Sequence, residues 1–326
     1  MAGYLHSYLG HLDPALKDAR VIEVVVNADG NVWVERAGET HMEMLEDLWM
    51  TPDRVTDLAQ QIANGTSNQF GNDHPILSAS VEYEGLTLRA QALTAPAVDA
   101  GTILAFRVFR PRKASGEQPK TFELLRKSDV SLEDERRAEI VTLRKLAATD
   151  LEGFLRALVE RRMNVVVSGG TSTGKTELGR KLLAYVPTHE RVITIEDSLE
   201  LLPSQPNALT LIAQRAETSP RSAAKLLQAC LRLRPDRIIL GELRGEEAVT
   251  FLDAINTGHG GSFTTLHAET ARKALDRLAL LVLGSGSRLT YAEVIRYLEG
   301  SIDVIVQMGR DGPKRGIVEI YIPGQT

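Results

Sequence analysis

The chain has 326 residues, of which 43% are hydrophobic and 25% charged, the balance of a globular protein with room for two domains. Its formal net charge of −5 argues against a dedicated nucleic-acid-binding protein, so we expect no direct nucleic-acid binding. Apolar runs such as 278–283 are too short to span a bilayer, and no signal-peptide-like segment follows Met1. We therefore expect a cytoplasmic protein. The single cysteine, Cys230, excludes an internal disulfide and a four-cysteine zinc module.

Residues 1–110 are expected to form a small α+β domain. Asp29-Gly30 and Glu84-Gly85 are turn signals between β-prone runs, so each predicts a β-hairpin. Apolar residues at helical spacing predict one helix between the hairpins. In chain order, the expected elements are strands over 21–26 and 32–35, a helix over 52–63, a hairpin over 76–92 and a strand over 104–109.

Residues 111–145 are expected to connect this domain to a second one. The stretch 111–120 is rich in proline, glycine, serine and basic residues, which is typical of a linker. A charged pattern with helical spacing follows over 121–162. Within it, Ser131 and Asp134 have the spacing of a capping box at a helix N-terminus.

Residues 146–326 alternate between strand and helix patterns, which predicts an α/β domain with a mostly parallel sheet and helices on both faces. Ser219 and Pro220 predict the start of one of its helices, with the serine as cap. Two antiparallel strands are expected at the edge of the sheet. The expected elements are strands over 164–168, 191–195, 237–240, 262–266, 302–308 and 316–322, and helices over 176–185 and 246–255.

The segment 169–176 matches the phosphate-loop pattern G-x-x-x-x-G-K-[ST] without a mismatch. It follows an apolar strand and opens a helix, as the chemistry requires, because backbone N–H groups at a helix N-terminus surround phosphates. Lys175 is expected to reach the β- and γ-phosphates of ATP, and the Thr176 hydroxyl to bind Mg²⁺. The nucleotide-binding residues predicted here are Gly169, Gly170, Thr171, Ser172, Thr173, Gly174, Lys175 and Thr176.

Acidic residues follow two of the predicted strands. Glu196 and Asp197 end one strand, and Glu242 follows another. Because ligands in such sheets lie at the carboxyl ends of the strands, these carboxylates are candidates for holding Mg²⁺ and for orienting the attacking water. We predict that Glu196 and Glu242 share these two roles, in an order that the sequence leaves open. Asp197 is equally well explained as a structural residue.

Two histidines occur near the end of a further predicted strand. His267 lies at its carboxyl end and is predicted to act in catalysis, sensing the γ-phosphate or contacting a neighbouring site. His259 lies among glycines, which indicates close approach of the backbone there, but a structural role explains it equally well.

Four segments together resemble the phosphate loop, aspartate box, second nucleotide motif and histidine box of the secretion-superfamily ATPases. They are 169–176 (GGTSTGKT), 193–201 (ITIEDSLEL), 232–245 (RLRPDRIILGELRG) and 257–268 (TGHGGSFTTLHA). The resemblance is greatest to the hexameric traffic ATPases of type IV secretion and plasmid conjugation. It implies a RecA-like P-loop ATPase domain, preceded by the α+β domain.

The resemblance also implies a homo-hexameric ring in which each nucleotide lies between the N-terminal and C-terminal domains. Arginines of the N-terminal domain then contact the phosphates, because a guanidinium matches phosphate oxygens and stays charged. Arg110 matches the family's strand-ending arginine, although the lysine that usually precedes the proline is absent; Arg107 is the alternative, and Arg89 matches a looser position. Four further arginines match family positions, Arg215 more loosely than the others, and each is expected to act as an arginine finger or to form a structural ion pair: Arg215, Arg232, Arg234 and Arg244.

Several machines share these motifs. The lack of a tetracysteine module disfavours type II secretion ATPases, and the Ser-Thr form of the loop favours conjugation systems over pilus retraction. Tight-adherence pilus ATPases, a RecA-like helicase and a nucleotide-gated docking module remain alternatives. The resemblance implies partners among other subunits of a secretion apparatus, with peripheral attachment at the cytoplasmic face of the inner membrane.

Overall fold

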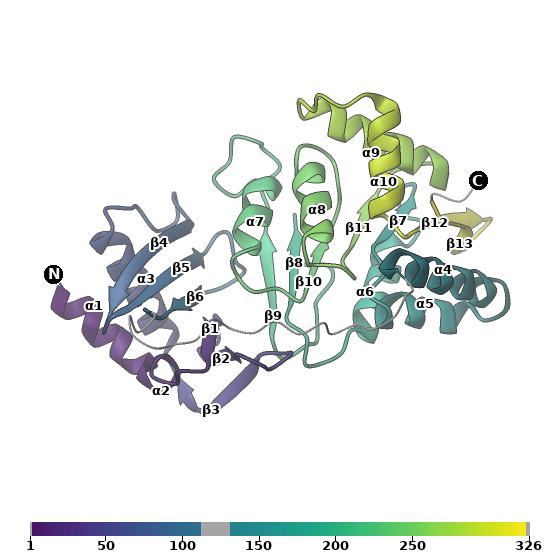
Figure 1. Ribbon diagram of the computed structural model, residues 1–326. Helices are drawn as coiled ribbons and strands as arrows, with labels where there is room; N and C mark the ends of the chain where they lie inside the picture. Colours follow the sequence, from purple (N-terminus) through teal and green to yellow (C-terminus); the bar gives the residue numbers. More distant parts are fainter. Residues whose placement is uncertain (1, 112–130, 324–326) are drawn as a thin grey trace.

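A computed structural model of the protein describes residues 2–111 and 131–323. These residues form two β-sheets that lie side by side, an N-terminal sheet of six strands and a C-terminal sheet of seven (Figure 1). Helices pack against both sheets, so the fold is of the α/β type. Most of the linker predicted over 111–120 lies outside the described residues. Among the described residues, no helix has the length and apolar character needed to cross a membrane.

The N-terminal sheet is antiparallel throughout, with the order β3-β2-β1-β6-β5-β4. Its strands are β1 (Val21–Val26), β2 (Asn31–Arg36), β3 (Glu43–Trp49), β4 (Ile76–Tyr83), β5 (Leu86–Thr94) and β6 (Thr102–Phe109). One face is covered by α1 (Ala2–Leu9), the 3-10 turn η1 (Gly10–Leu12), α2 (Asp13–Leu16) and α3 (Pro52–Gly65). The two predicted hairpins and the helix between them are confirmed.

In the C-terminal sheet, with the order β13-β12-β7-β11-β10-β8-β9, the strands from β12 to β9 all run parallel to one another. Only β13 is antiparallel, paired with β12 at the edge, as predicted for the last two strands. The strands are β7 (Val165–Gly169), β8 (Val192–Glu196), β9 (Ala208–Ile212), β10 (Arg237–Leu240), β11 (Phe263–Leu266), β12 (Val304–Asp311) and β13 (Lys314–Tyr321).

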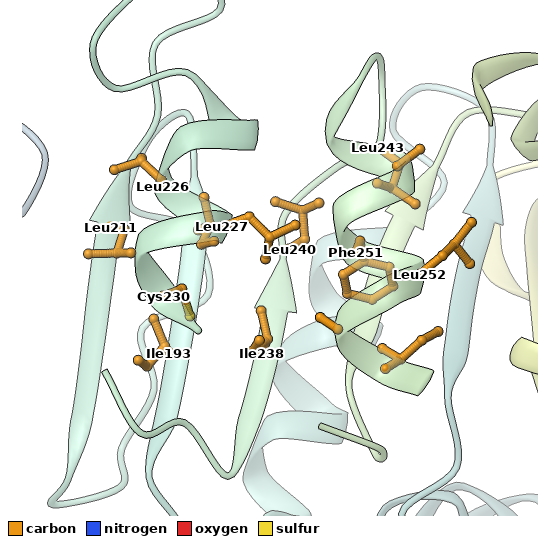
Figure 2. Close-up of a cluster of buried hydrophobic side chains, with 14 of the residues drawn as sticks. Ile193, Leu211, Leu226, Leu227, Cys230, Ile238, Leu240, Leu243, Phe251 and Leu252 are labelled. Atoms are coloured by element: carbon orange, nitrogen blue, oxygen red, sulfur yellow. The ribbon is translucent and has the colours of Figure 1, made fainter. Parts of the chain in front are cut away.

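Helices cover both faces of this sheet because successive strand residues point to opposite sides. Val165 and Val167 of β7 pack with α4, α5 and α6, whereas Val166 lies in the core formed with the other helices. Figure 2 shows this second core, with Cys230 of α7 and Phe251 of α8 packed between helices and strands. The helices are α4 (Leu132–Thr149), α5 (Leu151–Glu160), α6 (Lys175–Tyr185), α7 (Ala223–Cys230), α8 (Glu247–Asn256), α9 (Ala271–Gly284) and α10 (Tyr291–Ser301).

Two helix starts test the capping predictions. Ser131 caps α4 as predicted, since its hydroxyl oxygen accepts from the backbone N–H of Asp134 at 3.1 Å. The prediction for Ser219 was wrong, because α7 begins three residues later and Ser222 is its cap. The N–H of Ser222 bonds to the carbonyl of Ser219, so Pro220 lies in a turn, a position that its fixed φ suits equally well.

A shared hydrophobic core joins the two sheets at the β9 edge. Val25 and Leu93 of the N-terminal sheet lie in the same buried cluster as Leu211 of β9. Val98 forms an antiparallel bridge with Leu211, and the N–H of Ile212 donates to the carbonyl of Ala97 at 2.8 Å. The N-terminal part of the chain is therefore anchored to one edge of the C-terminal sheet by backbone as well as side chains.

A buried polar contact lies beside this core. The guanidinium of Arg191 is fully buried and donates to the side-chain oxygens of Asn27, at 2.8 Å, and of Asn207. Burial lowers the pKa of Arg191 to about 10, because a desolvated charge is disfavoured. At the rim, Arg234 pairs with Glu35 of β2 at 2.5 Å. Polar groups buried in this way fix the register of the junction, because any shift would leave them without partners.

The junction yields a stability prediction. Leu211 is fully buried in the shared core, so Leu211→Ala should lower the free energy of unfolding by about 2–5 kcal/mol through lost burial and the cavity left behind. Leu280→Ala is the matched control, because Leu280 is 63% exposed on α9 and should change stability by less than about 0.5 kcal/mol. Urea unfolding followed by circular dichroism measures both. Equal losses in the two variants would contradict a core at the β9 edge.

Candidate functional site

The carboxyl ends of β7, β11, β10 and β8 meet at one edge of the C-terminal sheet, because these four strands are adjacent and parallel. The segments that follow them line a single cavity with a volume of about 310 Å³. Its lining residues include Thr171, Ser172, Lys175 and Thr176 after β7; Glu196, Asp197, Ser198 and Glu200 at the end of β8; Gly241, Glu242 and Arg244 after β10; and Thr265 and His267 at the end of β11. No lining residue comes from 2–111.

The loop 169–176 is compact because its glycines lack side chains. A Cβ on Gly169 would lie 2.6 Å from the hydroxyl of Thr173 and 2.7 Å from the carbonyl oxygen of Met308. Gly174 has φ +98°, a left-handed conformation that L side chains rarely adopt, and it is the N-cap of α6. Ser172 is also left-handed, with φ +57°. The loop thus turns tightly from β7 into the N-terminus of α6.

The loop is also held from outside. Arg310, on β12, donates from Nη2 and Nε to the carbonyl oxygen of Ser172 at 2.8 and 3.2 Å. A charged donor to a backbone carbonyl is among the stronger hydrogen bonds of proteins. The strand next to β7 therefore supports the loop at Ser172, whose backbone is left-handed.

Lys175, the first residue of α6, directs its ammonium group back into the loop. Its Nζ donates to the carbonyl oxygens of Gly169 at 3.0 Å and Gly170 at 2.9 Å. Burial lowers the pKa of Lys175, and the nearby charge of Glu242 partly opposes this. The free N–H groups at the start of α6 lie beside this ammonium, so the loop concentrates positive potential where an anion such as phosphate would bind.

Two glutamates on the segment after β8 approach the start of α6. The carboxylate of Glu200 accepts a hydrogen bond from the Thr176 hydroxyl, with 3.0 Å between the two oxygens. Glu196 is buried, and its Oε1 accepts from the N–H groups of Glu200 at 3.2 Å and Leu201 at 2.9 Å. Burial raises the pKa of Glu196, against the lowering effect of these two amides. Glu196 is thus a desolvated carboxyl held in one orientation.

Glu242 has a contrasting environment. Burial acts to raise its pKa, but the hydrogen bond and charge of Arg244, with smaller effects of His267 and Lys175, bring the pKa below its ordinary value. Arg244 donates from Nη2 to Glu242 at 2.7 Å and from Nη1 to Asp197 at 2.7 Å. Asp197 also accepts from Arg215 at 2.8 Å. Glu242 is therefore ionised, and charges of alternating sign extend from it toward the surface.

His267 lies between Lys175 and Glu242. Its Nδ1 is 3.4 Å from the Lys175 ammonium, and its Nε2 is 3.5 Å from the Glu242 carboxylate. An ammonium can only donate, so Nδ1 is the acceptor and the neutral ring carries its proton on Nε2, facing the carboxylate. Burial lowers the pKa of His267, which agrees with a neutral ring. The imidazole thus connects the loop to Glu242.

The donor set fits a hard divalent cation bound together with phosphate. Thr176, Glu196 and Glu242 offer only oxygen atoms, which Mg²⁺ prefers, and Mg²⁺ usually takes one or two protein ligands alongside waters and substrate phosphates. Within 2–111 and 131–323 no group of three or more His, Cys, Asp or Glu side chains has the arrangement of a metal site. The oxygen donors of Thr176, Glu196 and Glu242 are thus compatible with a cation that is bound together with phosphate.

Comparisons with known proteins place this site in a family. A family model described as type II/IV secretion system protein matches residues 131–310, which include all four segments around the cavity. The chain belongs to the type II/IV secretion system protein family. The resemblance to secretion-superfamily ATPases that the four motifs carry is thereby confirmed.

Individual relatives cover nearly the whole chain. The type IV secretion system protein VirB11 of Brucella suis is 34% identical over 100% of this chain and 92% of its own length. The conjugal transfer protein TrbB of Rhizobium radiobacter is 33% identical over 95% of this chain and 86% of its own length. The crystal structure of the VirB11 ATPase from the Brucella suis type IV secretion system, in complex with sulphate, superposes with a TM-score of 0.84 at 32% identity, covering 98% of this chain and 95% of that one.

The N-terminal arginines that the family resemblance nominates lie away from the cavity. Arg110 is engaged within its own half of the chain, where it donates to the carbonyl oxygens of Val21, Leu16 and Asp18 at 2.6–2.7 Å. Arg107, with a side chain 68% exposed, lies 3.6 Å from Glu23. These contacts make Arg110 a structural arginine in this conformation and leave Arg107 accessible.

Arg107 shares its surface with Arg89. The two residues are register partners on β6 and β5, and their guanidinium carbons lie 5.9 and 4.7 Å from the ring centre of Phe109. Burial raises the pKa of the neighbouring Glu23 to about 7, and the charge of Arg107 only partly opposes this. The exposed face of β5 and β6, two inner strands of the N-terminal sheet, thus presents two arginines beside Phe109.

Of the remaining arginine candidates, Arg215 and Arg244 line the cavity and Arg234 does not. Arg234 pairs with Glu35 and Asp236 at 2.5 Å each, which is the structural ion pairing left open by the sequence. Arg232 is exposed and reaches Ser78 at 3.4 Å. His259 faces the carbonyl of Pro235 at 3.1 Å, outside the cavity, where burial lowers its pKa.

Sequence reasoning missed two residues of the site. Glu200 lies within the 193–201 segment and had a usable signal, because it follows Glu196 on the same short connection. Arg310 had no such signal, because it lies 138 positions from Ser172 in the chain and only the sheet brings β12 beside β7.

The two N-terminal arginines are separable by experiment. Arg110→Ala should lower the free energy of unfolding by at least about 2 kcal/mol, because three carbonyl oxygens lose a charged donor. Arg107→Ala should change it by less than about 0.5 kcal/mol, because Arg107 is largely exposed. Urea unfolding of both variants gives the two values. An Arg110→Ala protein as stable as the Arg107→Ala protein would show that the carbonyl contacts of Arg110 contribute little.

Proposed function

We propose that the protein is an ATP-hydrolysing motor of a bacterial type IV secretion or conjugation apparatus. The observation that carries the proposal is the cavity at the strand ends, where an ammonium, a helix N-terminus and two glutamates in unlike environments converge. The relatives support the same assignment, since VirB11 is named a type IV secretion protein and an ATPase and TrbB a conjugal transfer protein.

In this proposal the chain comprises an N-terminal α+β domain over 1–110, a connecting segment over 111–145 and a RecA-like P-loop ATPase domain over 146–326. The strand order β7-β11-β10-β8 in a parallel sheet supports the last assignment, because it places the loop, both glutamates and His267 at one edge. The loop residues from Gly169 to Thr176 bind the phosphates of ATP through backbone N–H groups. Lys175 exchanges its contacts with the carbonyls of Gly169 and Gly170 for the β- and γ-phosphates.

Mg²⁺, held by Thr176 and Glu242 with Glu196 in its outer shell, would neutralise charge on the phosphates. The pKa directions support a division of roles between the two glutamates. Glu196, whose pKa is raised by burial, is suited to orient a water and accept its proton. Glu242, kept ionised beside Arg244, is suited to hold the cation. When two carboxyl groups lie in different environments, their pKa values differ, so one can act as a general base while the other stays charged and holds a cation.

His267 lies where it would respond to the presence or absence of the γ-phosphate. A γ-phosphate drawn to Lys175 changes the charge that Nδ1 of His267 faces, and the ring passes this change to Glu242 through Nε2. After hydrolysis and release of phosphate, the arginines and His267 lose an anionic partner. Contacts that differ between two nucleotide states are what shift a protein between conformations, and here they would drive motion between domains.

The arginines of the N-terminal domain reach a nucleotide only across a subunit boundary. The cavity has no lining residue from 2–111, and the shared core anchors that part of the chain along β9. Arg107 is exposed and available for such a contact, and Arg110 would first have to release its three carbonyls. A homo-hexameric ring, implied by the family resemblance, supplies the neighbouring subunit.

We further propose that the ring works at the cytoplasmic face of the inner membrane, attached through other secretion-apparatus subunits or peripherally. Motors of tight-adherence or type IV pili are the alternative, since the motif set is common to them. A non-motor docking module is the alternative of a different class, and turnover distinguishes it.

The first test of the proposal is ATP turnover. The purified protein should hydrolyse ATP with Mg²⁺, and Lys175→Ala should reduce the rate at least a hundredfold, because the only loop ammonium is lost. Release of inorganic phosphate is the measurement, with Lys181→Ala, an exposed lysine on the same helix, as the matched control. Binding of ATP without turnover in the wild-type protein would favour the docking module over the motor.

The second test concerns the division between the glutamates. Glu196→Gln should reduce the maximal rate by a factor of about 100 or more while Mg²⁺-dependent ATP binding persists, because a general base typically contributes 10²–10⁴-fold. Glu242→Gln should reduce the rate and also raise the Mg²⁺ concentration needed for ATP binding. Phosphate release and calorimetric ATP binding at several Mg²⁺ concentrations measure the two effects. A Glu242→Gln protein with intact turnover would refute the role assigned to Glu242.

A further inference from the structure

Glu200 makes three contacts that tie the cavity together. Its carboxylate accepts a hydrogen bond from the Thr176 hydroxyl at 3.0 Å. Its backbone N–H donates to the carboxylate of Glu196 at 3.2 Å. Its backbone carbonyl accepts from Nε of Arg180, on α6, at 2.7 Å. One residue thus connects the hydroxyl predicted to bind the metal, the buried carboxyl predicted to orient water, and the helix that begins at Lys175.

The contact with Thr176 determines which way the hydroxyl points. A threonine hydroxyl has one proton and two acceptor lone pairs, and its proton rotates toward the best available acceptor. When that proton is committed to the Glu200 carboxylate, the lone pairs are left for a cation. Without Glu200, the proton would be free to turn to other acceptors, or toward the position that the cation needs.

The second contact links Glu200 to Glu196. The N–H groups of Glu200 and Leu201 fix one oxygen of the Glu196 carboxyl, and Thr194 reaches the other at 3.4 Å. These amides keep their donors whatever the side chain at 200, so a change at this side chain alters Thr176 first. Glu200 therefore allows the orientation of Thr176 to be tested without removing the support of Glu196.

We propose that Glu200 is a positioning residue: its carboxylate orients the Thr176 hydroxyl so that the oxygen is available to the divalent cation that accompanies the nucleotide. The inference rests on the proposed function, because it concerns the same metal. In many metal sites, a residue that does not touch the metal accepts a hydrogen bond from a metal ligand and so orients it. Losing such an acceptor lowers the metal affinity about 10–100-fold.

The test uses the full-length protein and a non-hydrolysable ATP analogue, with binding measured by isothermal titration calorimetry across a range of Mg²⁺ concentrations. Glu200→Ala should raise the Mg²⁺ concentration for half-maximal binding about tenfold. Glu200→Gln should keep most of the wild-type response, because the amide oxygen still accepts the Thr176 proton. Nucleotide binding in EDTA should be the same in all three proteins, because the loop and Lys175 are unchanged.

Glu177→Ala is the matched control, because this substitution removes the same charge. Glu177 lies next to Thr176 on α6, and its side chain is 80% exposed. The variant should follow the wild type. Thermal melts without nucleotide exclude unfolding as the cause of a weaker response. If Glu200→Ala bound the analogue with the same Mg²⁺ dependence as the wild type, the inference would be overturned. It would also be overturned if Glu200→Gln raised the required Mg²⁺ concentration as much as Glu200→Ala does, because that result would indicate that Glu200 is a charged ligand of the metal. Absence of Mg²⁺-dependent binding in the wild type would instead overturn the proposed function.

Discussion

The site of this protein depends on the parallel pairing of β7, β11, β10 and β8. Parallel neighbours bring their carboxyl ends to the same edge of a sheet, so residues up to about a hundred positions apart in the chain meet in one cavity. The pairing in turn requires both faces of the sheet to be covered, because strands such as β7 carry apolar side chains on both sides. The helices on the two faces are thus a condition for the site.

Within the cavity, charges of opposite sign alternate from the loop outward. The neutral ring of His267 lies between Lys175 and Glu242, and Arg244 joins Glu242 to Asp197. Such an arrangement keeps each buried charge near a partner, which lowers the cost of desolvation. It also means that an added phosphate changes the balance of several residues together. Glu196 lies outside this series, held by backbone amides, and this separation distinguishes the two glutamates chemically.

The junction of the two halves has a consequence for movement. The shared core at the β9 edge, the backbone bond from Ile212 to Ala97 and the buried Arg191 tie the N-terminal sheet to β9 of the same chain. A pivot between these surfaces would expose apolar side chains and break the buried hydrogen bond from Arg191 to Asn27. The junction therefore resists relative movement of the N-terminal sheet and β9 of the same chain.

The sequence by itself determined the local features. The loop 169–176, the strand ends carrying Glu196, Glu242 and His267, and the two N-terminal hairpins were all predictable, because each depends on residues close together in the chain. One failure was local: two serines near Pro220 compete as caps, and only the turn formed by 219–222 decides between them.

Tertiary structure alone decided which of these residues touch. The strand order places Arg310 beside Ser172 and Glu200 beside Thr176, and it leaves Arg110 bonded to carbonyls far from the cavity. No local pattern encodes such contacts, because they arise from sheet pairing between segments that are distant in the chain. The sequence therefore supplied the chemical groups, and the packing of the sheets determined their partners.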